Sequence, residues 1–94
     1  MSNNEKIEFF ANEYNHQDWK AYSRCFRETE IPEKLLDIMP DDIIRPLLYL
    51  LGDDYTQIWI NKEIKALDNQ KPVELVKTDI GRRALKEFVM RMHC

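Results

Sequence analysis

The sequence predicts an all-α fold in which about five to seven short helices form one compact single-domain bundle. Apolar residues recur at helical spacing along most of the 94 residues, and no segment shows the strict alternation of a strand. Prolines, two isolated glycines and pairs of aspartates divide the chain into short segments. A chain of this length buries only about 60 to 65% of its unfolded surface, so it has room for one core.

Two helices are expected at the start of the chain. Apolar residues of the first one follow a polar start at near-helical spacing: Ile7, Phe9, Phe10 and Tyr14. Asn15 can cap the second helix, in which Trp19, Tyr22 and Phe26 share one face. Core packing is the favoured interpretation of these rings, because large aromatic side chains supply the buried area that a short chain needs.

Prolines and aspartates set the limits of the next two helices. Pro32 suits the first position of a short third helix that runs to Met39 and stops at Pro40. The following segment is so rich in isoleucine and leucine that most of its faces must be buried. Its start stays open. Asp41 or Asp42 can cap it, but Pro46 beyond the first turn would cost about 3 kcal/mol, so a start at Pro46 is the alternative.

Gly52 is expected to end that helix, and Asp53 or Asp54 to cap a fifth one. Pro72 begins a short turn, and Thr78 can cap the final helix. The apolar stripe of this last helix is Ile80, Ala84, Leu85, Phe88, Val89 and Met92. Its basic residues are expected to point mostly outward: Arg82, Arg83, Lys86 and Arg91.

Composition and motifs argue against several classes of protein. The formal net charge is −3, so a nucleic-acid site would need a local basic patch. No apolar run approaches the roughly 18 residues of a membrane span, and no export signal is recognisable. Cys25 and Cys94 form neither a disulfide framework nor a zinc motif, which fits the reducing cytoplasm.

No catalytic constellation is recognisable either. His93 and Cys94 are adjacent at the end of the chain, where the geometry of a nucleophilic pair would not be held, and His16 lies at a helix start. The sequence has no glycine-rich phosphate loop and no metal-binding motif. We therefore expect a protein that is not an enzyme and that needs no cofactor or metal.

The second half of the chain carries a recognisable pattern, with unbroken spacing after Trp59. Its matching residues are Leu51-Gly52, Trp59-Ile60, the stretch from Ala66 to Asn69, Lys71-Pro72, the stretch from Glu74 to Val76, Thr78, Gly81, Val89 and Arg91-Met92. This pattern resembles the toxin-binding domain of Xre, MbcA and ParS antitoxins. Glu63-Ile64 replaces a frequent Pro-Asn of the family, so the fifth helix is expected to continue toward Leu67.

The resemblance implies a bacterial, cytoplasmic toxin-antitoxin protein that binds a cognate toxin, commonly a RES-domain enzyme that consumes NAD, and neutralises it by occluding its active site. The residues implied as the partner contact are a plug of Arg91, Met92, His93 and Cys94, flanked by Arg82, Arg83 and Lys86. The residues implied as the structural motif are Gly52, Trp59, Leu67, Pro72, Leu75, Thr78 and Gly81.

The N-terminal half lacks a clear form of a feature that many members of this family have, a helix-turn-helix that binds DNA. Residues 1–50 are expected to be helical without a clear helix-turn-helix, and to pack as one domain with the antitoxin-like residues 51–94. DNA binding is therefore not favoured. A DNA-binding regulator with a degenerate helix-turn-helix and a stand-alone adaptor remain the alternatives, and a homodimer stays open.

Overall fold

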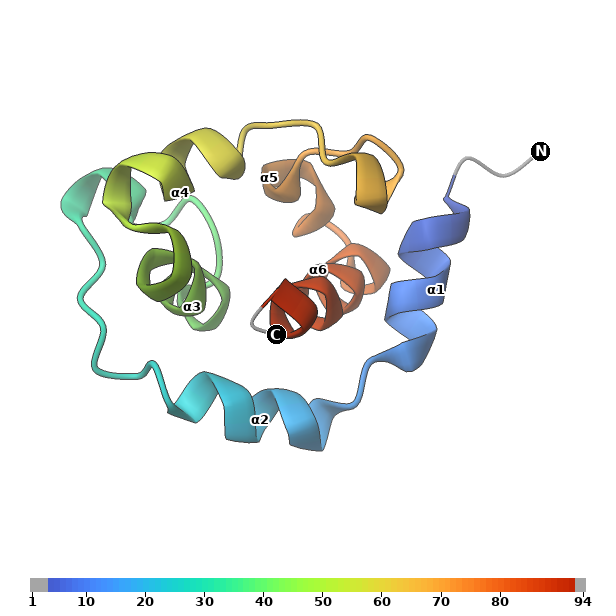
Figure 1. The fold of residues 1–94 in the computed structure, drawn as a ribbon, viewed down its shortest axis with the longest axis horizontal. Helices are drawn as coiled ribbons and strands as arrows, with labels where there is room; N and C mark the ends of the chain where they lie inside the picture. Colours follow the sequence, from blue (N-terminus) through green and yellow to red (C-terminus); the bar gives the residue numbers. More distant parts are fainter. Residues whose placement is uncertain (1–3, 93–94) are drawn as a thin grey trace.

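The computed structural model describes residues 4–92 and, within them, contains six α-helices and no β-strand (Figure 1). The α-helices are α1 (Glu5–Glu13), α2 (His16–Arg24), α3 (Asp41–Leu51), α4 (Asp53–Trp59), α5 (Pro72–Leu75) and α6 (Asp79–Met92). Two short 3-10 helices, η1 (Glu33–Leu35) and η2 (Lys65–Leu67), connect them. The all-α prediction, with five to seven short helices, is confirmed.

The last helix, α6, lies at the centre of the bundle, with α1, α2, α3 and α5 packed around it (Figure 1). Its most extensive packing is with α1. Ala84, Leu85 and Val89 are completely buried in α6, so its core-facing side fills the space between the two halves of the chain. Ile7 and Ala11 of α1 belong to the same hydrophobic cluster. The N-terminal helices therefore complete a core that the C-terminal segment begins.

Helix α3 begins at Asp41, so the alternative start at Pro46 is wrong. Pro46 is buried inside the helix, where its missing N–H removes one helical hydrogen bond. Burial of Ile43, Ile44 and Leu47, each with no exposed surface, offsets this cost. Gly52 then ends the helix with a φ of 80°, a backbone conformation that favours glycine.

The helix expected from Pro32 to Met39 does not form; only the 3-10 turn η1 is present there. Leu36 is extended and Asp37 is left-handed, with a φ of 64°, so the chain turns away after one turn. This path buries Leu35 and Met39, whereas Leu36 stays about half exposed. The backbone therefore follows the path that buries both Leu35 and Met39, rather than the helix that the local spacing of apolar residues predicts.

The expected continuation of the fifth helix toward Leu67 is also wrong, because α4 ends at Trp59. A separate turn, η2, buries Leu67, and the next two residues are left-handed, with φ values of 58° for Asp68 and 62° for Asn69. The Asp68 carboxylate accepts a hydrogen bond of 2.9 Å from the backbone N–H of Ile7. It thereby satisfies an orphan amide in the first turn of α1, as a capping residue would.

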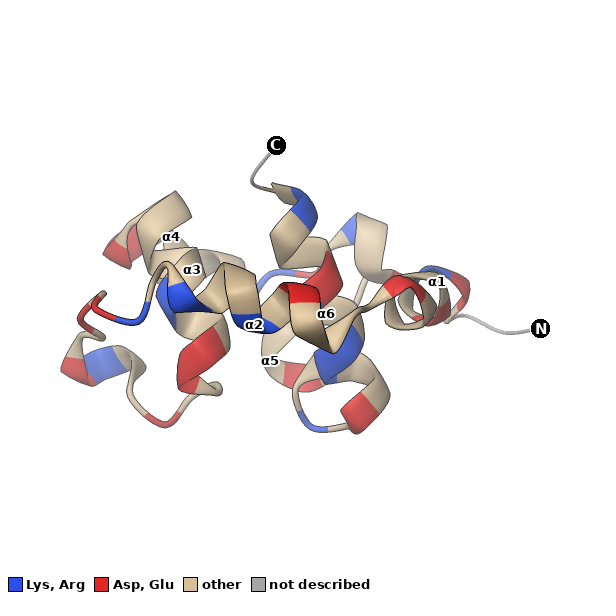
Figure 2. Ribbon diagram, turned by 90° about the horizontal axis from the view of Figure 1, so that it is seen from below, with Lys and Arg blue, Asp and Glu red and all other residues tan. Residues whose placement is uncertain are grey.

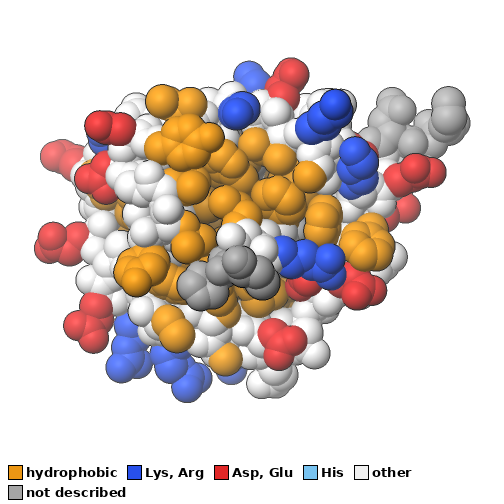
Figure 3. All heavy atoms as spheres, viewed as in Figure 1, with side chains coloured by type: hydrophobic (Ala, Val, Ile, Leu, Met, Phe, Trp, Pro, Cys, Tyr) orange, Lys and Arg blue, Asp and Glu red, His pale blue; other side chains and the backbone are white. Residues whose placement is uncertain are grey.

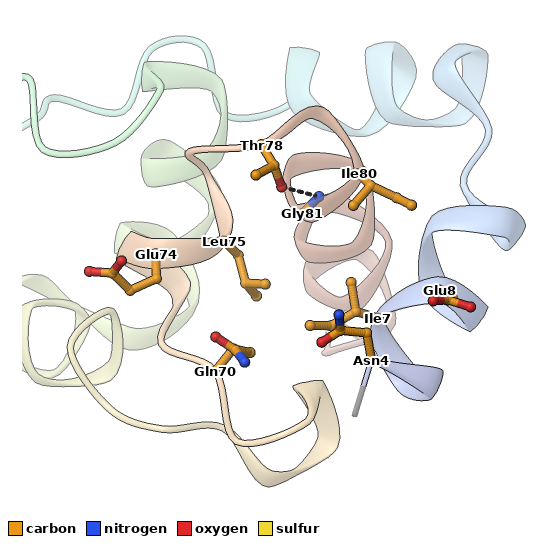
Figure 4. A pocket seen from close by; sticks show the side chains of 9 residues that line it. All are labelled: Asn4, Ile7, Glu8, Gln70, Glu74, Leu75, Thr78, Ile80 and Gly81. Carbon is orange, nitrogen blue, oxygen red and sulfur yellow. Dashed lines mark hydrogen bonds between the residues drawn. The ribbon is translucent and has the colours of Figure 1, made fainter. Parts of the chain in front are cut away.

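The start of α6 packs tightly against the end of α5. The Thr78 hydroxyl accepts a hydrogen bond of 3.0 Å from the Gly81 N–H (Figure 4). A Cβ on Gly81 would collide with the backbone carbonyl oxygen of Leu75 and lie 2.8 Å from the Thr78 hydroxyl. Only glycine therefore lets these two helices approach so closely.

We predict that Gly81→Ala lowers the free energy of unfolding by about 1 to 3 kcal/mol, because α5 must move away from α6 to admit the methyl group. Alanine's better helix propensity, worth about 1 kcal/mol, should not compensate. Urea denaturation measures the loss. Ile80→Ala, at a neighbouring position that is 44% exposed, is the control and should cost about 0.5 kcal/mol or less. Equal stability of the two variants would contradict the tight packing.

Candidate partner-binding face

Hydrophobic side chains gather on one face of the molecule, around the C-terminal end of α6 and between α4 and α1 (Figure 3). We call this surface the apolar face. On α4, Ile58 is 60% exposed and Tyr55 is 45% exposed; on α1, Phe9 is 51% exposed. Clusters of exposed apolar side chains on a small protein are typical of surfaces that bind other macromolecules.

Four rings form a continuous row that links the three helices of this face. Phe9 contacts Phe10 and Phe10 contacts Phe88, each pair edge-on with ring centroids 5.5 Å apart. Phe88 in turn stacks on Trp59, with centroids 6.2 Å apart. We call these four side chains the aromatic row. Trp59 is buried and anchors the row in the core, whereas Phe9 exposes the opposite end to solvent.

Arg91 lies at the α1 side of the apolar face. Its guanidinium group is 5.4 Å from the ring centroid of Phe9 and 5.3 Å from that of Phe10. Its Nε donates to a Glu87 carboxylate oxygen at 2.8 Å, and a terminal nitrogen lies 3.8 Å from Glu13. The Arg91 side chain nevertheless stays 45% exposed. It is positioned by α1 and still accessible to a partner.

Of the seven residues implied as a partner contact, the five that the structure describes do not form one cluster. Arg82 and Arg83 lie in the first turns of α6, where both pair with Asp79, at 3.8 and 3.1 Å. Arg91 is about 14 Å further along the helix axis at 1.5 Å per residue, and Figure 2 shows basic segments toward both ends of α6. Met92 is half-buried beside the core. His93 and Cys94 lie outside the described residues.

Lys86 differs from its expected outward orientation. Its side chain is only 17% exposed, and its Nζ lies 3.7 Å from a carboxylate oxygen of Asp42. The same nitrogen is 5.6 Å from the Trp19 ring centroid and 5.7 Å from that of Tyr14. The Trp19 indole N–H donates to the same Asp42 oxygen at 2.9 Å. Lys86 therefore joins α6 to α3 through Asp42, to α2 through Trp19, and to the end of α1 through Tyr14.

The surroundings of Lys86 also affect Tyr14. Burial, and then the negative charge of Asp42, raise the pKa of the Tyr14 hydroxyl, which interacts with the His16 ring nitrogen at 2.9 Å. Within residues 4–92, no group of three or more histidine, cysteine, aspartate or glutamate side chains could hold a metal ion. The helices of the same range include none that is long and apolar enough to cross a membrane.

A family comparison identifies what kind of domain carries this face. The family model of the antitoxin Xre/MbcA/ParS C-terminal toxin-binding domain matches residues 47–93, which is half of the chain. The chain belongs to this family. No curated protein and no solved structure matches it. The resemblance drawn from the sequence is confirmed, and the matched domain is one that binds toxins in antitoxins.

The antitoxin-family segment covers the second half of α3 together with α4, α5 and α6. Leu67 and Pro72 are fully buried within it and Leu75 nearly so. The apolar face, however, also includes Phe9 and Phe10, which precede the matched segment. The sequence placed Phe9 and Phe10 in the first helix but did not indicate them as part of a partner contact. The available signal was the helical spacing: Phe9 is two residues from both Ile7 and Ala11, so it lies on the opposite side of α1 from these two buried residues.

We predict that Lys86→Met lowers the free energy of unfolding by about 1 kcal/mol, because it keeps the apolar stem and removes the charge facing Asp42, Trp19 and Tyr14. Arg83→Met is the control. Its ion pair with Asp79 is exposed, so the loss should stay within about 0.5 kcal/mol. Urea denaturation compares the two. A neutral effect of Lys86→Met would show that the contact is not structural.

Proposed function

We propose that this antitoxin-family protein neutralises a cognate toxin protein by binding it through the apolar face. The observation that carries the proposal is the exposed hydrophobic surface around the end of α6, in a segment that belongs to a toxin-binding domain family. Exposed aromatic and aliphatic side chains beside a buried anchor such as Trp59 are typical of energetic hot spots. The proposed role is binding in the cytoplasm, without a catalytic step of its own.

The proposed mechanism is occlusion of the toxin's active site by the end of α6. Burial of Ala84, Leu85 and Val89 fixes this helix in the bundle, so the residues from Arg91 onward leave from a defined position. A pre-organised element loses little conformational entropy on binding. The family resemblance suggests a RES-type enzyme that consumes NAD as the toxin, and residues Arg91 to Cys94 as the segment that enters its cleft.

Arg91 suits a role at such a cleft. Its guanidinium presents a planar fork of donors that matches carboxylates in two-pronged geometry. Of its two carboxylate partners, Glu87 contacts Nε, whereas Glu13 lies 3.8 Å from a terminal nitrogen and is about half exposed. Exposed ion pairs such as that with Glu13 contribute only about 0 to 1 kcal/mol. Exchange of this partner for a toxin carboxylate would therefore cost little.

A cluster of basic residues supports DNA binding as a second candidate function. Four cations line a shallow hollow of about 280 Å³ between α2 and α3: Lys20, Arg24, Arg27 and Arg45. Asp42 also lines it but already contacts Lys86 and Trp19. Such a patch is what an acidic protein would need to bind phosphates. Toxin binding remains the first proposal, because the family model that matches the chain describes a toxin-binding domain.

We predict that the full chain co-purifies with the product of its adjacent gene and suppresses that protein's toxicity. Ile58→Asp, which puts a charge on the apolar face, should weaken binding about 30-fold or more. Ile80→Asp, at an exposed position in the first turn of α6, is the matched control and should bind normally. Calorimetry of the purified pair measures both. Equal affinities of the two variants would exclude the apolar face as the contact.

The same pair of proteins tests the occlusion mechanism. Deletion of residues 91–94 should leave the antitoxin folded and still able to bind through α4, but unable to silence the toxin. Circular dichroism checks the fold, and a growth assay checks silencing. If the shortened protein silences its partner completely, the tail does not act as the plug.

The DNA candidate makes a separate prediction. Binding through four cations should weaken about a hundredfold between roughly 50 and 200 mM salt, because each phosphate contact releases counterions. The double variant Arg24→Glu/Arg27→Glu should abolish binding to a labelled duplex, and Lys62→Glu/Lys71→Glu is the charge-matched control. Fluorescence anisotropy measures both. Absence of binding at low salt would reject the candidate.

A further inference from the structure

We propose that helix α1, which lies outside the family-matched residues 47–93, is part of the toxin-binding face, and that it receives an apolar projection of the toxin bordered by carboxylates. This inference rests on the proposed function and specifies the partner chemistry of the same site. The proposal assigns α1 a binding role in addition to its packing against α6.

A hollow between α1 and η2 offers the apolar part of this contact. Its volume is about 300 Å³, and it is lined by Glu5, Lys6, Phe9, Phe10 and Ala66. The two phenylalanines and the alanine supply its floor, and Phe9 is 51% exposed. The hollow therefore has room for one or two apolar side chains of a partner, with charged groups only at its edge.

The hollow and the end of α6 form one surface. Phe10 lines the hollow and also contacts Phe88 of α6, which stacks on Trp59 of α4. Arg91 lies over both Phe9 and Phe10. A partner that covers the C-terminal end of α6 and reaches past Arg91 would therefore also cover α1.

The position of α1 is fixed before binding. Ile7 and Ala11 are buried against the core. The Ile7 N–H donates to the Asp68 carboxylate at 2.9 Å, and the Lys6 ammonium donates to the Lys65 carbonyl at 3.3 Å. These contacts hold Phe9 in place relative to η2, so binding would not require α1 to fold or move.

The charges around the hollow indicate the polarity of the partner. Lys and Arg side chains border the upper and right-hand edges of the apolar face, toward α1, and Asp and Glu side chains lie beside them at the rim (Figure 3). Lys6 lines the hollow together with Glu5. Arg91 covers the two phenylalanines, pairs with Glu87 and Glu13, and is still 45% exposed. An aspartate or glutamate of the toxin beside its apolar projection would pair with Lys6 and with the exposed fork of Arg91, which favours a projection bordered by carboxylates at these two points.

The test measures the affinity of the purified adjacent-gene product for the full chain and its variants. Phe9→Asp should weaken binding about tenfold or more, because it places a charge in the apolar hollow. Tyr49→Asp is the control, since Tyr49 is 67% exposed and its ring contacts Phe26 of the α2 side. Circular dichroism confirms that both variants are folded.

Lys6→Glu provides a second variant that should not unfold the protein, because an acidic residue is favourable in the first turn of a helix. It should weaken binding several-fold and reduce the dependence of affinity on salt, whereas Lys20→Glu on α2 should do neither. This variant keeps the proposal testable if Phe9→Asp fails to fold.

The outcomes separate the inference from the proposed function. If the full chain does not bind the adjacent-gene product, the proposed function fails, and the inference with it. If binding is lost in Ile58→Asp but unchanged in Phe9→Asp and Lys6→Glu, the proposed function stands and the role of α1 is overturned. Weaker binding of the Phe9 and Lys6 variants, with both controls unchanged, supports the inference.

Discussion

The structure depends on the burial of α6 by helices from the other half of the chain. Ala84, Leu85 and Val89 have no exposed surface, and α1, α2, α3 and α5 all contribute to covering that helix. Helices α1 and α2, from the N-terminal half, cover sides of α6 that the antitoxin-family segment does not cover in this structure. The two halves of the chain therefore share one core.

Close approach and polar contacts then set the geometry around α6. Gly81 lets α5 lie against the helix start, and Lys86 connects the middle of the helix to Asp42 and Trp19. At the other end, Phe88 and Arg91 pack on α1. The helix thus has a tightly packed beginning and an end whose neighbours are partly exposed. That asymmetry is why the proposed contact lies at its C-terminal end.

Local sequence signals predicted a large part of this fold. Gly52 ends α3 and Thr78 contacts the Gly81 N–H, because both features depend only on nearby residues. The missing third helix was not predictable in this way, because the left-handed conformation of Asp37 serves the burial of Leu35 and Met39. The spacing of apolar residues shows which side chains need burial. It does not show whether a helix or an extended path of the backbone will bury them.

The candidate site was predicted less completely, because its parts come together only in three dimensions. The sequence gives no sign that Asp68 would cap a helix 61 residues earlier, or that Lys86 would meet Asp42. The family resemblance implied that Arg82, Arg83 and Lys86 flank the residues from Arg91 onward, yet Arg82 and Arg91 lie toward opposite ends of the helix. The aromatic row was hidden for the same reason, since its rings belong to α1, α4 and α6.

The aromatic row has a consequence for how such a protein can diverge. Phe88 and Trp59 serve the hydrophobic core and also lie beneath the proposed contact, so substitutions there would disturb folding and recognition together. Phe9, Tyr55 and Ile58 project from the same surface but contribute little to the interior. Changes of toxin specificity during evolution would therefore accumulate at these outer positions, while the inner pair stays constant.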